Sequence, residues 1–422
     1  MRILKVFIEI DGVQRYVGNI EGESFSDACF AYSKDYMDSE FGRPISVSLP
    51  FMDGEYSSKQ TAQFFDGLLP EGFSRKAVAD WIKTDERDYI TMLAVLGREC
   101  LGAIRIVESD ESMSSSYEKL SLEQVKELAA EGATKSTQML METHLSLTGA
   151  TGKVGLYYDE GNGEWYLPKG EAPSTHIVKQ SHVRFEKIVL NEQLCMLTAK
   201  KLGIDTPESF VVNAGDGQDS EVLFATKRYD RMIDGGKKIS GFRSPNRLHQ
   251  EDFAQAMGIS STDKYEREPA GYLGKIFDVI RAYCTDPLGD QLELWRRVCF
   301  NYLIGNTDCH IKNHSLLYGK DLKSIRLAPA YDIVCTRVYS TTRQMSYYLS
   351  DEIDIDKVNR KHILAAAADA GLSERMAMKI FDEIADSIDG AVSEAAEDLL
   401  SQGLSGAEEM AHRISVARIN IM

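Results

Sequence analysis

The chain has 422 residues, of which 43% are hydrophobic and 27% are charged, and these proportions are ordinary for a folded protein of two or three domains. Its 65 acidic and 48 basic residues give a net charge of -17. Phosphate contacts need clustered Lys and Arg, so this charge argues against nucleic-acid binding by bulk attraction. Any association with DNA would run through a basic partner or a local patch.

The cysteines and the N-terminus indicate a reducing compartment. The seven cysteines form no Cys-x-x-Cys pair and no Cys/His cluster at zinc spacing, which predicts free thiols. The first ten residues alternate charged and apolar types, and no apolar run approaches the roughly 20 residues that span a bilayer. We therefore expect a cytoplasmic chain without membrane contact.

The N-terminal region predicts a small β-rich domain. The segments 4–10 and 14–20 alternate around Asp11-Gly12, which is a hairpin turn signal. Helical patterns follow over 24–39 and 75–96, the second ending at a glycine. The polar, small residues of 108–116 indicate an exposed linker. We place the first domain at 1–115.

The next region, 116–230, predicts strands 154–158 and 165–167 joined by Gly-Asn-Gly, then a strand that ends at Lys179, and a helix over 191–202. A lone lysine at a strand end is usually a solvated charge, whereas in kinases such a lysine holds the α- and β-phosphates of ATP. Glu192 falls in the first turn of the predicted helix, where an acid suits the helix dipole and could also pair with Lys179.

The loop Ser-Leu-Thr-Gly-Ala-Thr-Gly-Lys at 146–153 does not fit a Walker A motif. That motif needs Gly at position 147 and Ser or Thr at position 154, where this chain has Leu and Val. A glycine-containing loop rich in backbone amides can still bind phosphate ahead of a strand.

The last region, 231–422, is expected to be mostly helical. The segment 224–231 passes from an apolar strand to a charged connector, 248–255 begins like a helix with acids in its first turn, and 360–370, 374–384 and 390–400 have helical periodicity.

The most informative pattern is the run Ile-Gly-Asn-Thr-Asp-Cys-His-Ile-Lys-Asn-His-Ser at 304–315, followed by Ala-Pro-Ala-Tyr-Asp-Ile-Val at 328–334. Asp308 and Asn313 have the Asp-x-x-x-x-Asn spacing of a kinase catalytic loop, in which the Asp orients the attacking hydroxyl and the Asn binds magnesium. A hairpin over 315–327 would return Asp332 beside Asn313 as a further magnesium ligand.

A structural alternative exists for each of these residues. Asp308 and Asn313 could cap a helix after the apolar segment 298–304, and Asp332 could begin another helix. Helix capping does not require Asp308, His310, Lys312, Asn313 and Asp332 together, and this conjunction favours a phosphoryl-transfer site.

These two motifs resemble the signature of the HipA-type toxin kinase family. Segments 65–72, 146–153, 174–179 and 248–253 also resemble family motifs in the family's order, so that the likeness covers nearly the whole chain. The resemblance implies an α+β, two-lobed protein-kinase-like fold with a small β-rich N-terminal subdomain and a mostly helical C-lobe, and it implies ATP and Mg²⁺ as cofactors.

The resemblance also assigns residues. Asp308 would be catalytic, and Asn313 and Asp332 would bind the metal. The residues expected to contact ATP are Thr148, Gly149, Ala150, Thr151, Gly152, Lys153, Lys179, Lys227, Arg228, Tyr229, His310, Lys312, Asn313, Tyr331 and Asp332.

In the family, a serine at the position of Ser146 is autophosphorylated, which ejects the loop and switches the kinase off. A doubly charged phosphate on a phosphate-binding loop would repel ATP, so such a switch is physically reasonable. Thr148 is a second hydroxyl that could share the role, and a surface serine is by default a solvated turn residue.

The chain departs from the family pattern at three places. Cys309 stands where Gly or Asp is usual, Thr151-Gly152 replaces the usual pair before Lys153, and Lys227 adds a positive charge. Cys309 is small enough for the loop, so we expect activity to survive.

The leading hypothesis is an ATP- and magnesium-dependent serine/threonine kinase of toxin type. The family implies a DNA-binding antitoxin partner, contact with DNA only through it, and in some members phosphorylation of an aminoacyl-tRNA synthetase. The alternatives are a catalytically idle corepressor that docks on a DNA-bound antitoxin, and a kinase of a lipid or small molecule.

Overall fold

The computed structural model describes residues 1–109, 114–131, 135–136, 138–139, 152–181 and 184–420. The chain divides into two compact units. Unit 1 comprises 1–180, 225–261 and 316–325, and unit 2 comprises 181–224, 262–315 and 326–422. Helices and sheets occur in both, which makes the fold α+β as predicted. The boundaries expected at 115/116 and 230/231 stay a prediction.

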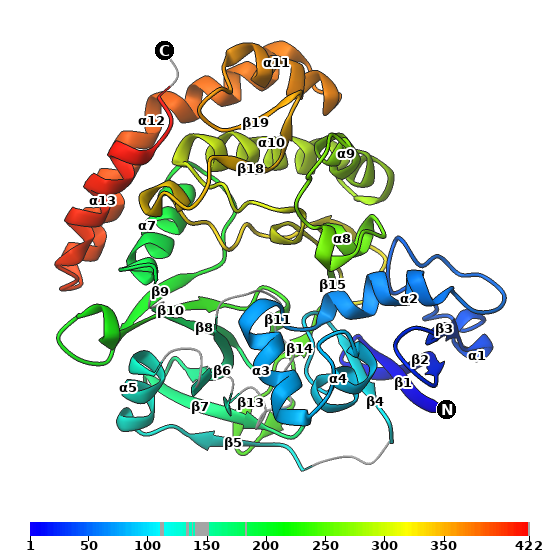
Figure 1. Cartoon of the computed structure of the whole chain (residues 1–422). Helices are drawn as coiled ribbons and strands as arrows, with labels where there is room; N and C mark the ends of the chain where they lie inside the picture. The colour runs from blue at the N-terminus through cyan, green and yellow to red at the C-terminus, as the bar shows by residue number, and fades with distance from the viewer. Residues whose placement is uncertain (110–113, 132–134, 137, 140–151, 182–183, 421–422) are drawn as a thin grey trace. The chain divides into compact units, whose positions relative to one another are not determined.

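Unit 1 begins with a four-stranded sheet of order β3-β2-β1-β4 (Figure 1). Its strands are β1 (Arg2–Ile10), β2 (Val13–Gly22), β3 (Cys29–Tyr32) and β4 (Ile104–Val107). Asp11 and Gly12 both have positive φ, 50° and 76°, which is the backbone that a two-residue hairpin between β1 and β2 requires. The predicted N-terminal hairpin is confirmed.

The helix expected over 24–39 is wrong. Residues 29–32 form β3 beside β2, and only α1 (Lys34–Met37) is helical, with Ser33 as its N-cap. Phe30 is fully buried among aromatic rings, including Tyr32 at 4.8 Å and Phe65 at 5.0 Å between centroids. Pairing with β2 and burial of alternate side chains outweigh the local helical pattern.

The helix predicted over 75–96 is divided in two. Unit 1 contains α2 (Ser58–Phe65), the 3-10 turn η1 (Asp66–Leu68), α3 (Gly72–Ile82) and α4 (Tyr89–Leu96). Lys83 ends α3 in the left-handed conformation, and Asp88 then caps α4 through the backbone N–H of Thr91 at 3.1 Å. Gly97 ends α4 as expected.

Five strands of a second, larger sheet follow one another in the order β5-β7-β6-β8-β10. These strands are β5 (Ser116–Lys119), β6 (Lys153–Asp159), β7 (Glu164–Lys169), β8 (His176–Gln180) and β10 (Val222–Lys227), of which β10 enters from unit 2. The predicted β6–β7 hairpin and the strand ending near Lys179 are confirmed. The helix α5 (Leu122–Ala130) begins at a capping box formed by Ser121 and Gln124.

The remaining part of unit 1 consists of short strands: β11 (Arg231–Met232), β12 (Lys238–Ile239), β13 (Phe242–Arg243), β14 (Asn246–Arg247) and β15 (Gln250–Asp252), followed by α8 (Phe253–Ala256). The helix expected from 248 starts only at Phe253, with Asp252 as its cap. Glu251 therefore lies in a strand and is buried. The predicted hairpin over 315–327 is confirmed as β16 (Ser315–Tyr318) and β17 (Ile325–Leu327).

Unit 2 is mostly helical. It contains α7 (Ile188–Lys201), α9 (Tyr272–Tyr283), α10 (Pro287–Ile304), α11 (Arg360–Asp369), α12 (Glu374–Ser401) and α13 (Gly406–Ala417), with strands β9 (Ser209–Asn213), β18 (Gln344–Leu349) and β19 (Glu352–Asp354). The helices α7, α12 and α13 contact one another, and α10 contacts α12 (Figure 1). The two helices predicted over 374–400 are one helix of 28 residues, because Gly390 is tolerated inside it.

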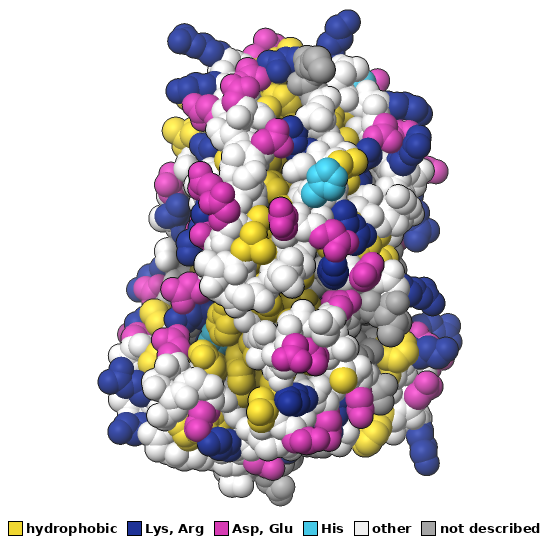
Figure 2. Space-filling model, turned by 90° about the vertical axis from the view of Figure 1, so that its left-hand side faces the viewer, with side chains coloured by type: hydrophobic (Ala, Val, Ile, Leu, Met, Phe, Trp, Pro, Cys, Tyr) yellow, Lys and Arg dark blue, Asp and Glu magenta, His cyan; other side chains and the backbone are white. Residues whose placement is uncertain are grey.

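Acidic and basic side chains are interspersed on the face that Figure 2 shows. No helix in the described part of the chain has both the length and the apolar composition that crossing a bilayer demands.

Candidate active site

The loop after α10 carries the predicted catalytic residues of unit 2. The helix ends at Gly305, whose φ of 83° is the left-handed C-cap that glycine favours. No α-helix begins at Asp308 or Asn313 in the described structure. The latter ends η4, a 3-10 turn (Ile311–Asn313) that has no side-chain cap. The helix-capping alternative is therefore excluded for this loop.

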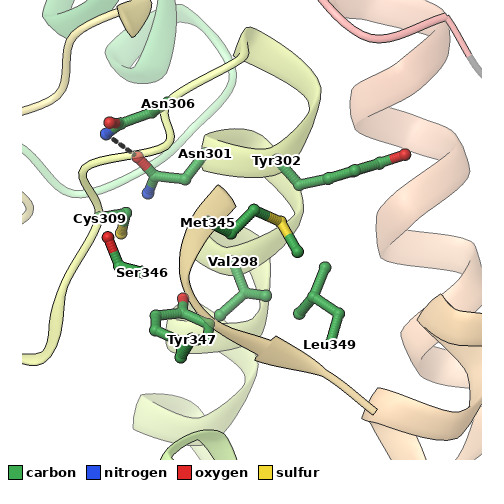
Figure 3. Close-up of a pocket in the computed structure, with 9 residues that line it drawn as sticks. All are labelled: Val298, Asn301, Tyr302, Asn306, Cys309, Met345, Ser346, Tyr347 and Leu349. Carbon is green, nitrogen blue, oxygen red and sulfur yellow. Dashed lines mark hydrogen bonds between the residues drawn. The ribbon is translucent and has the colours of Figure 1, made fainter. Parts of the chain in front are cut away.

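Two asparagines connect α10 to Asp308. The amide of Asn306 donates to Asn301 Oδ1 at 2.7 Å (Figure 3), and its oxygen accepts the backbone N–H of Asp308 at 3.0 Å. Asn301 in turn donates to the backbone carbonyl of Arg297 at 2.9 Å. Asn306 lies in the motif that identified the loop, but its positioning role follows only from these contacts.

Asn313 closes the loop onto Asp308. Its Nδ2 donates to the Asp308 backbone carbonyl at 2.9 Å, and its backbone N–H donates to the carbonyl of His310 at 2.8 Å. Because the amide nitrogen is engaged, the oxygen is the atom that this side chain can offer to a cation. Asp308, His310, Lys312 and Asn313 thus lie together in one tight loop.

Asp332 lies on the segment that follows β17. Its neighbour Tyr331 contacts Ser315 Oγ at 2.6 Å and donates to the Lys312 carbonyl at 2.8 Å, which brings this segment to the Asn313 loop. Asp332 has φ 57°, a conformation that a non-glycine residue rarely adopts and that is common at functional sites.

The segment after Asp332 is held by α7. Asn191 is fully buried, accepts the backbone N–H of Cys335 at 2.9 Å and donates to its carbonyl at 3.1 Å. This two-sided clamp was not anticipated from the sequence, because 144 residues separate the partners. Glu192 beside it is buried in the second turn of α7, not the first, which weakens the helix-dipole explanation for its presence.

The residues of unit 2 suit magnesium held partly by its substrate. Among the described residues, no group of three or more His, Cys, Asp or Glu could hold a metal ion by itself. Mg²⁺ usually takes one or two protein oxygens together with phosphate oxygens and water. The Asn313 amide oxygen and the Asp332 carboxylate fit that demand.

A small pocket lies directly behind the loop and is lined by residues of α10, the loop and β18, namely Val298, Asn301, Tyr302, Asn306, Cys309, Met345, Ser346, Tyr347 and Leu349 (Figure 3). Its volume of about 20 Å³ has room for about one water molecule and is far too small for a nucleotide.

Unit 1 carries the predicted phosphate ligands. Lys153 on β6 and Lys179 on β8 are direct partners across the antiparallel ladder, so both side chains lie on the same face of the sheet. Two ammonium groups at facing positions suit a polyphosphate. Gly152, just before β6, is buried, whereas Ser146 and the predicted ligands Thr148, Gly149, Ala150 and Thr151 lie outside the described residues.

The predicted connector residues behave differently from one another. Lys227 contacts Glu160 at 3.0 Å near the surface, and the hydroxyl of Tyr229 donates to Gln250. The Arg228 side chain is wholly buried in an ion network, so we expect it to position the connector and not to contact a ligand.

This ion network joins the first sheet to the connector within unit 1. Three arginines and three acids balance in charge: Arg228, Arg231, Arg247, Glu9, Glu99 and Asp230. Glu99 is central, with guanidinium nitrogens of Arg231 at 2.9 Å and Arg247 at 2.8 Å. Burial alone would raise the pKa of Glu99, but the arginines lower this pKa to about 2.

Comparison with known families agrees with both parts of the chain. The model of the HipA N-terminal domain matches residues 8–107, and that of the HipA-like C-terminal domain matches 145–392. The chain belongs to the HipA family.

Relatives of this HipA-family chain cover most or all of its length. It is 28% identical to the Sinorhizobium fredii protein Y4mE over 100% of both chains. It is 26% identical to the serine/threonine-protein kinase toxin HipA of Shewanella oneidensis, over 90% of this chain and 86% of that one. The structure of the Shewanella HipA, solved in a complex with HipB and operator DNA, matches with a TM-score of 0.77 at 23% identity, covering 97% of this chain and 96% of that chain. The predicted two-lobed, kinase-like fold is therefore confirmed.

Proposed function

We propose that this HipA-family chain is an ATP- and magnesium-dependent serine/threonine kinase that acts as the toxin of a toxin-antitoxin pair. The observation that carries the proposal is the loop of unit 2, in which Asn306 and Asn313 both hydrogen-bond the backbone of Asp308. Fixing a carboxylate and a metal-ligand amide in one loop is what phosphoryl transfer requires, because catalysis there is mainly positioning and electrostatic stabilisation.

The chemistry assigns one task to each residue. Asp308 accepts the proton of the acceptor hydroxyl as the new O–P bond forms and the bond to ADP breaks. Lys179, with Lys153 opposite it, holds the phosphates. Asn313 and Asp332 would bind Mg²⁺. When bound, this ion would neutralise charge on the phosphate oxygens. We also propose that Ser146 is the autophosphorylated residue of the phosphate-binding loop.

A DNA-binding antitoxin is the proposed partner. The Shewanella relative was solved with HipB and operator DNA, and the net charge of -17 makes direct DNA binding by this chain unfavourable. A basic, DNA-bound protein would connect this acidic chain to the DNA.

The test is to incubate the pure protein with Mg-ATP beside Asp308→Gln and to map phosphate by intact mass and peptide mass spectrometry. We expect phosphate on Ser146 or Thr148 in the wild type alone. Equal phosphorylation of Asp308→Gln would sink the catalytic assignment. Failure to bind Mg-ATP in a thermal-shift titration would favour the corepressor alternative, and label found only in small molecules would favour a small-molecule or lipid kinase.

A further inference from the structure

Tyr265 makes a contact with Asp308 that the assigned roles do not explain. Its hydroxyl donates to Asp308 Oδ1 at 2.5 Å, within the range of a charge-assisted O–H···O⁻ bond. The two residues are 43 positions apart, and nothing in the sequence marks the tyrosine. The Tyr265 side chain is 40% exposed.

Ser346 on β18 holds the backbone next to Tyr265 and the backbone next to Asp308. Its carbonyl accepts the backbone N–H of Glu266 at 2.8 Å, and its hydroxyl donates to the carbonyl of Thr307 at 2.8 Å. The residue after Tyr265 and the residue before Asp308 are therefore attached to the same point of the fold.

Glu266 fixes the Tyr265 segment further. It is buried, and its carboxylate accepts backbone N–H groups of Ala270 at 2.6 Å, Tyr272 at 3.1 Å and Tyr348 at 2.9 Å. The backbone at Tyr265 is thus anchored by the residue beside it, and the contact with Asp308 is a consequence of the packing of unit 2.

The tyrosine ring itself lies at the surface. It meets the His310 ring edge-on, with centroids 5.1 Å apart and planes at 87°, and the Lys264 ammonium lies 5.4 Å from its centroid. A partly exposed aromatic side chain on an anchored backbone can change rotamer without disturbing the core.

The Tyr265 hydroxyl gives Asp308 the same kind of hydrogen bond that an acceptor hydroxyl would give it in catalysis. A general base must accept a hydrogen bond from the hydroxyl that it deprotonates, and in this loop that base is Asp308. We propose that the Tyr265 hydroxyl occupies the place of the acceptor hydroxyl on Asp308, so that a serine, a threonine or water must displace it before phosphoryl transfer. This role rests on the proposed kinase function, and it makes Tyr265 a gate on the acceptor side of the site.

The experiment compares Tyr265→Phe with the wild-type full-length chain. Phenylalanine keeps the ring against His310 and removes only the hydroxyl. The readouts are Mg-ATP hydrolysis without acceptor and phosphorylation of a synthetic peptide of residues 140–152 of this chain. We expect faster hydrolysis and a KM for the peptide lower by on the order of 10-fold, with the KM for ATP unchanged. Tyr283→Phe, at an exposed tyrosine at the end of α9, is the matched control and should behave as wild type.

The outcomes separate the gate from the kinase proposal. A lower kcat in Tyr265→Phe would show that the tyrosine orients Asp308. Unchanged hydrolysis and an unchanged KM for the peptide would show that it neither orients Asp308 nor blocks the acceptor. Both results overturn the gate and leave the kinase proposal intact. If wild type and Tyr265→Phe both transfer no phosphate from ATP, the kinase proposal itself fails and the gate fails with it.

Discussion

Asn313 donates its side-chain amide to the backbone carbonyl of Asp308 at 2.9 Å, so the residue proposed to bind metal also shapes the loop of the proposed base. Asn313→Asp would supply a stronger oxygen ligand but would lose the donor and place a carboxylate beside a carbonyl. We expect phosphate transfer to fall about 10- to 100-fold in spite of the added charge. The measurement is kcat across a magnesium titration.

A matched control for that variant is Asn359→Asp at the N-cap of α11. Asn359 accepts the backbone N–H of Lys361 at 2.9 Å, and aspartate caps a helix equally well. This control should keep wild-type activity. Full activity in Asn313→Asp would mean that the amide donor is dispensable and that the residue serves only as a ligand.

Two substitutions of Asp332 test its charge and its left-handed backbone conformation separately. Asparagine tolerates φ near 57°, whereas alanine is strained there. We expect Asp332→Asn to unfold in urea like the wild type and Asp332→Ala to be about 1 kcal/mol less stable, with both inactive because the carboxylate that we propose to bind magnesium is gone. An active Asp332→Asn would contradict the metal assignment, and equal stabilities would contradict the role of strain.

The local parts of the fold and site were predictable from the sequence, and the long-range contacts were not. The Asp11-Gly12 turn, the β6–β7 hairpin and the Asp308–Asn313 spacing depend on neighbouring residues, so their patterns are visible in the chain. The local pattern around β3 predicts a helix, whereas its pairing with β2 is a tertiary contact that the pattern does not contain. Asn191 contacts Cys335 across 144 residues of sequence, and Tyr265 contacts Asp308 across 43. No local sequence pattern indicates contacts at such separations.

The ion network around Glu99 should be sensitive to the loss of one acid. Removing this carboxylate leaves three buried guanidinium groups with two acids, and an uncompensated buried charge costs about 3–5 kcal/mol. We expect Glu99→Ala to lose that much stability in urea unfolding. Glu118→Ala, which removes an exposed carboxylate 3.6 Å from Lys169, should change stability by less than about 1 kcal/mol. Similar losses in the two variants would refute the network's importance.

Glu251 predicts a pH dependence of stability in unit 1. Burial raises the pKa of this carboxyl from 4.5 to about 7, although Ser46 Oγ and the hydroxyl of Tyr318 donate to it. The folded state holds the proton of Glu251 more tightly than the unfolded state does. The stabilising contribution of this proton is therefore complete below pH 4.5 and is lost as the pH rises to 7. The loss is on the order of 3 kcal/mol.

Glu251→Gln removes the titrating group, so the stability of this variant should fall less than that of the wild type between pH 4.5 and 7. Urea unfolding at several pH values measures the difference. Glu397→Gln, at an exposed position on α12, should follow the wild-type profile. Parallel profiles for wild type and Glu251→Gln would show that folding does not raise the pKa of Glu251.

Cys309 and His314 could be mistaken for a nucleophile and its base, since Sγ lies 3.3 Å from Nε2. Burial raises the pKa of the Cys309 thiol to about 12 and lowers the pKa of His314 to about 3, so both groups are neutral near pH 7. Of the seven cysteines, only Cys29 is not buried. We expect a thiol reagent at pH 7 to label one cysteine before the other six in the native protein, and none on that time scale in Cys29→Ser, without affecting phosphate transfer. Fast labelling of Cys309 would show that the loop opens and exposes its thiol.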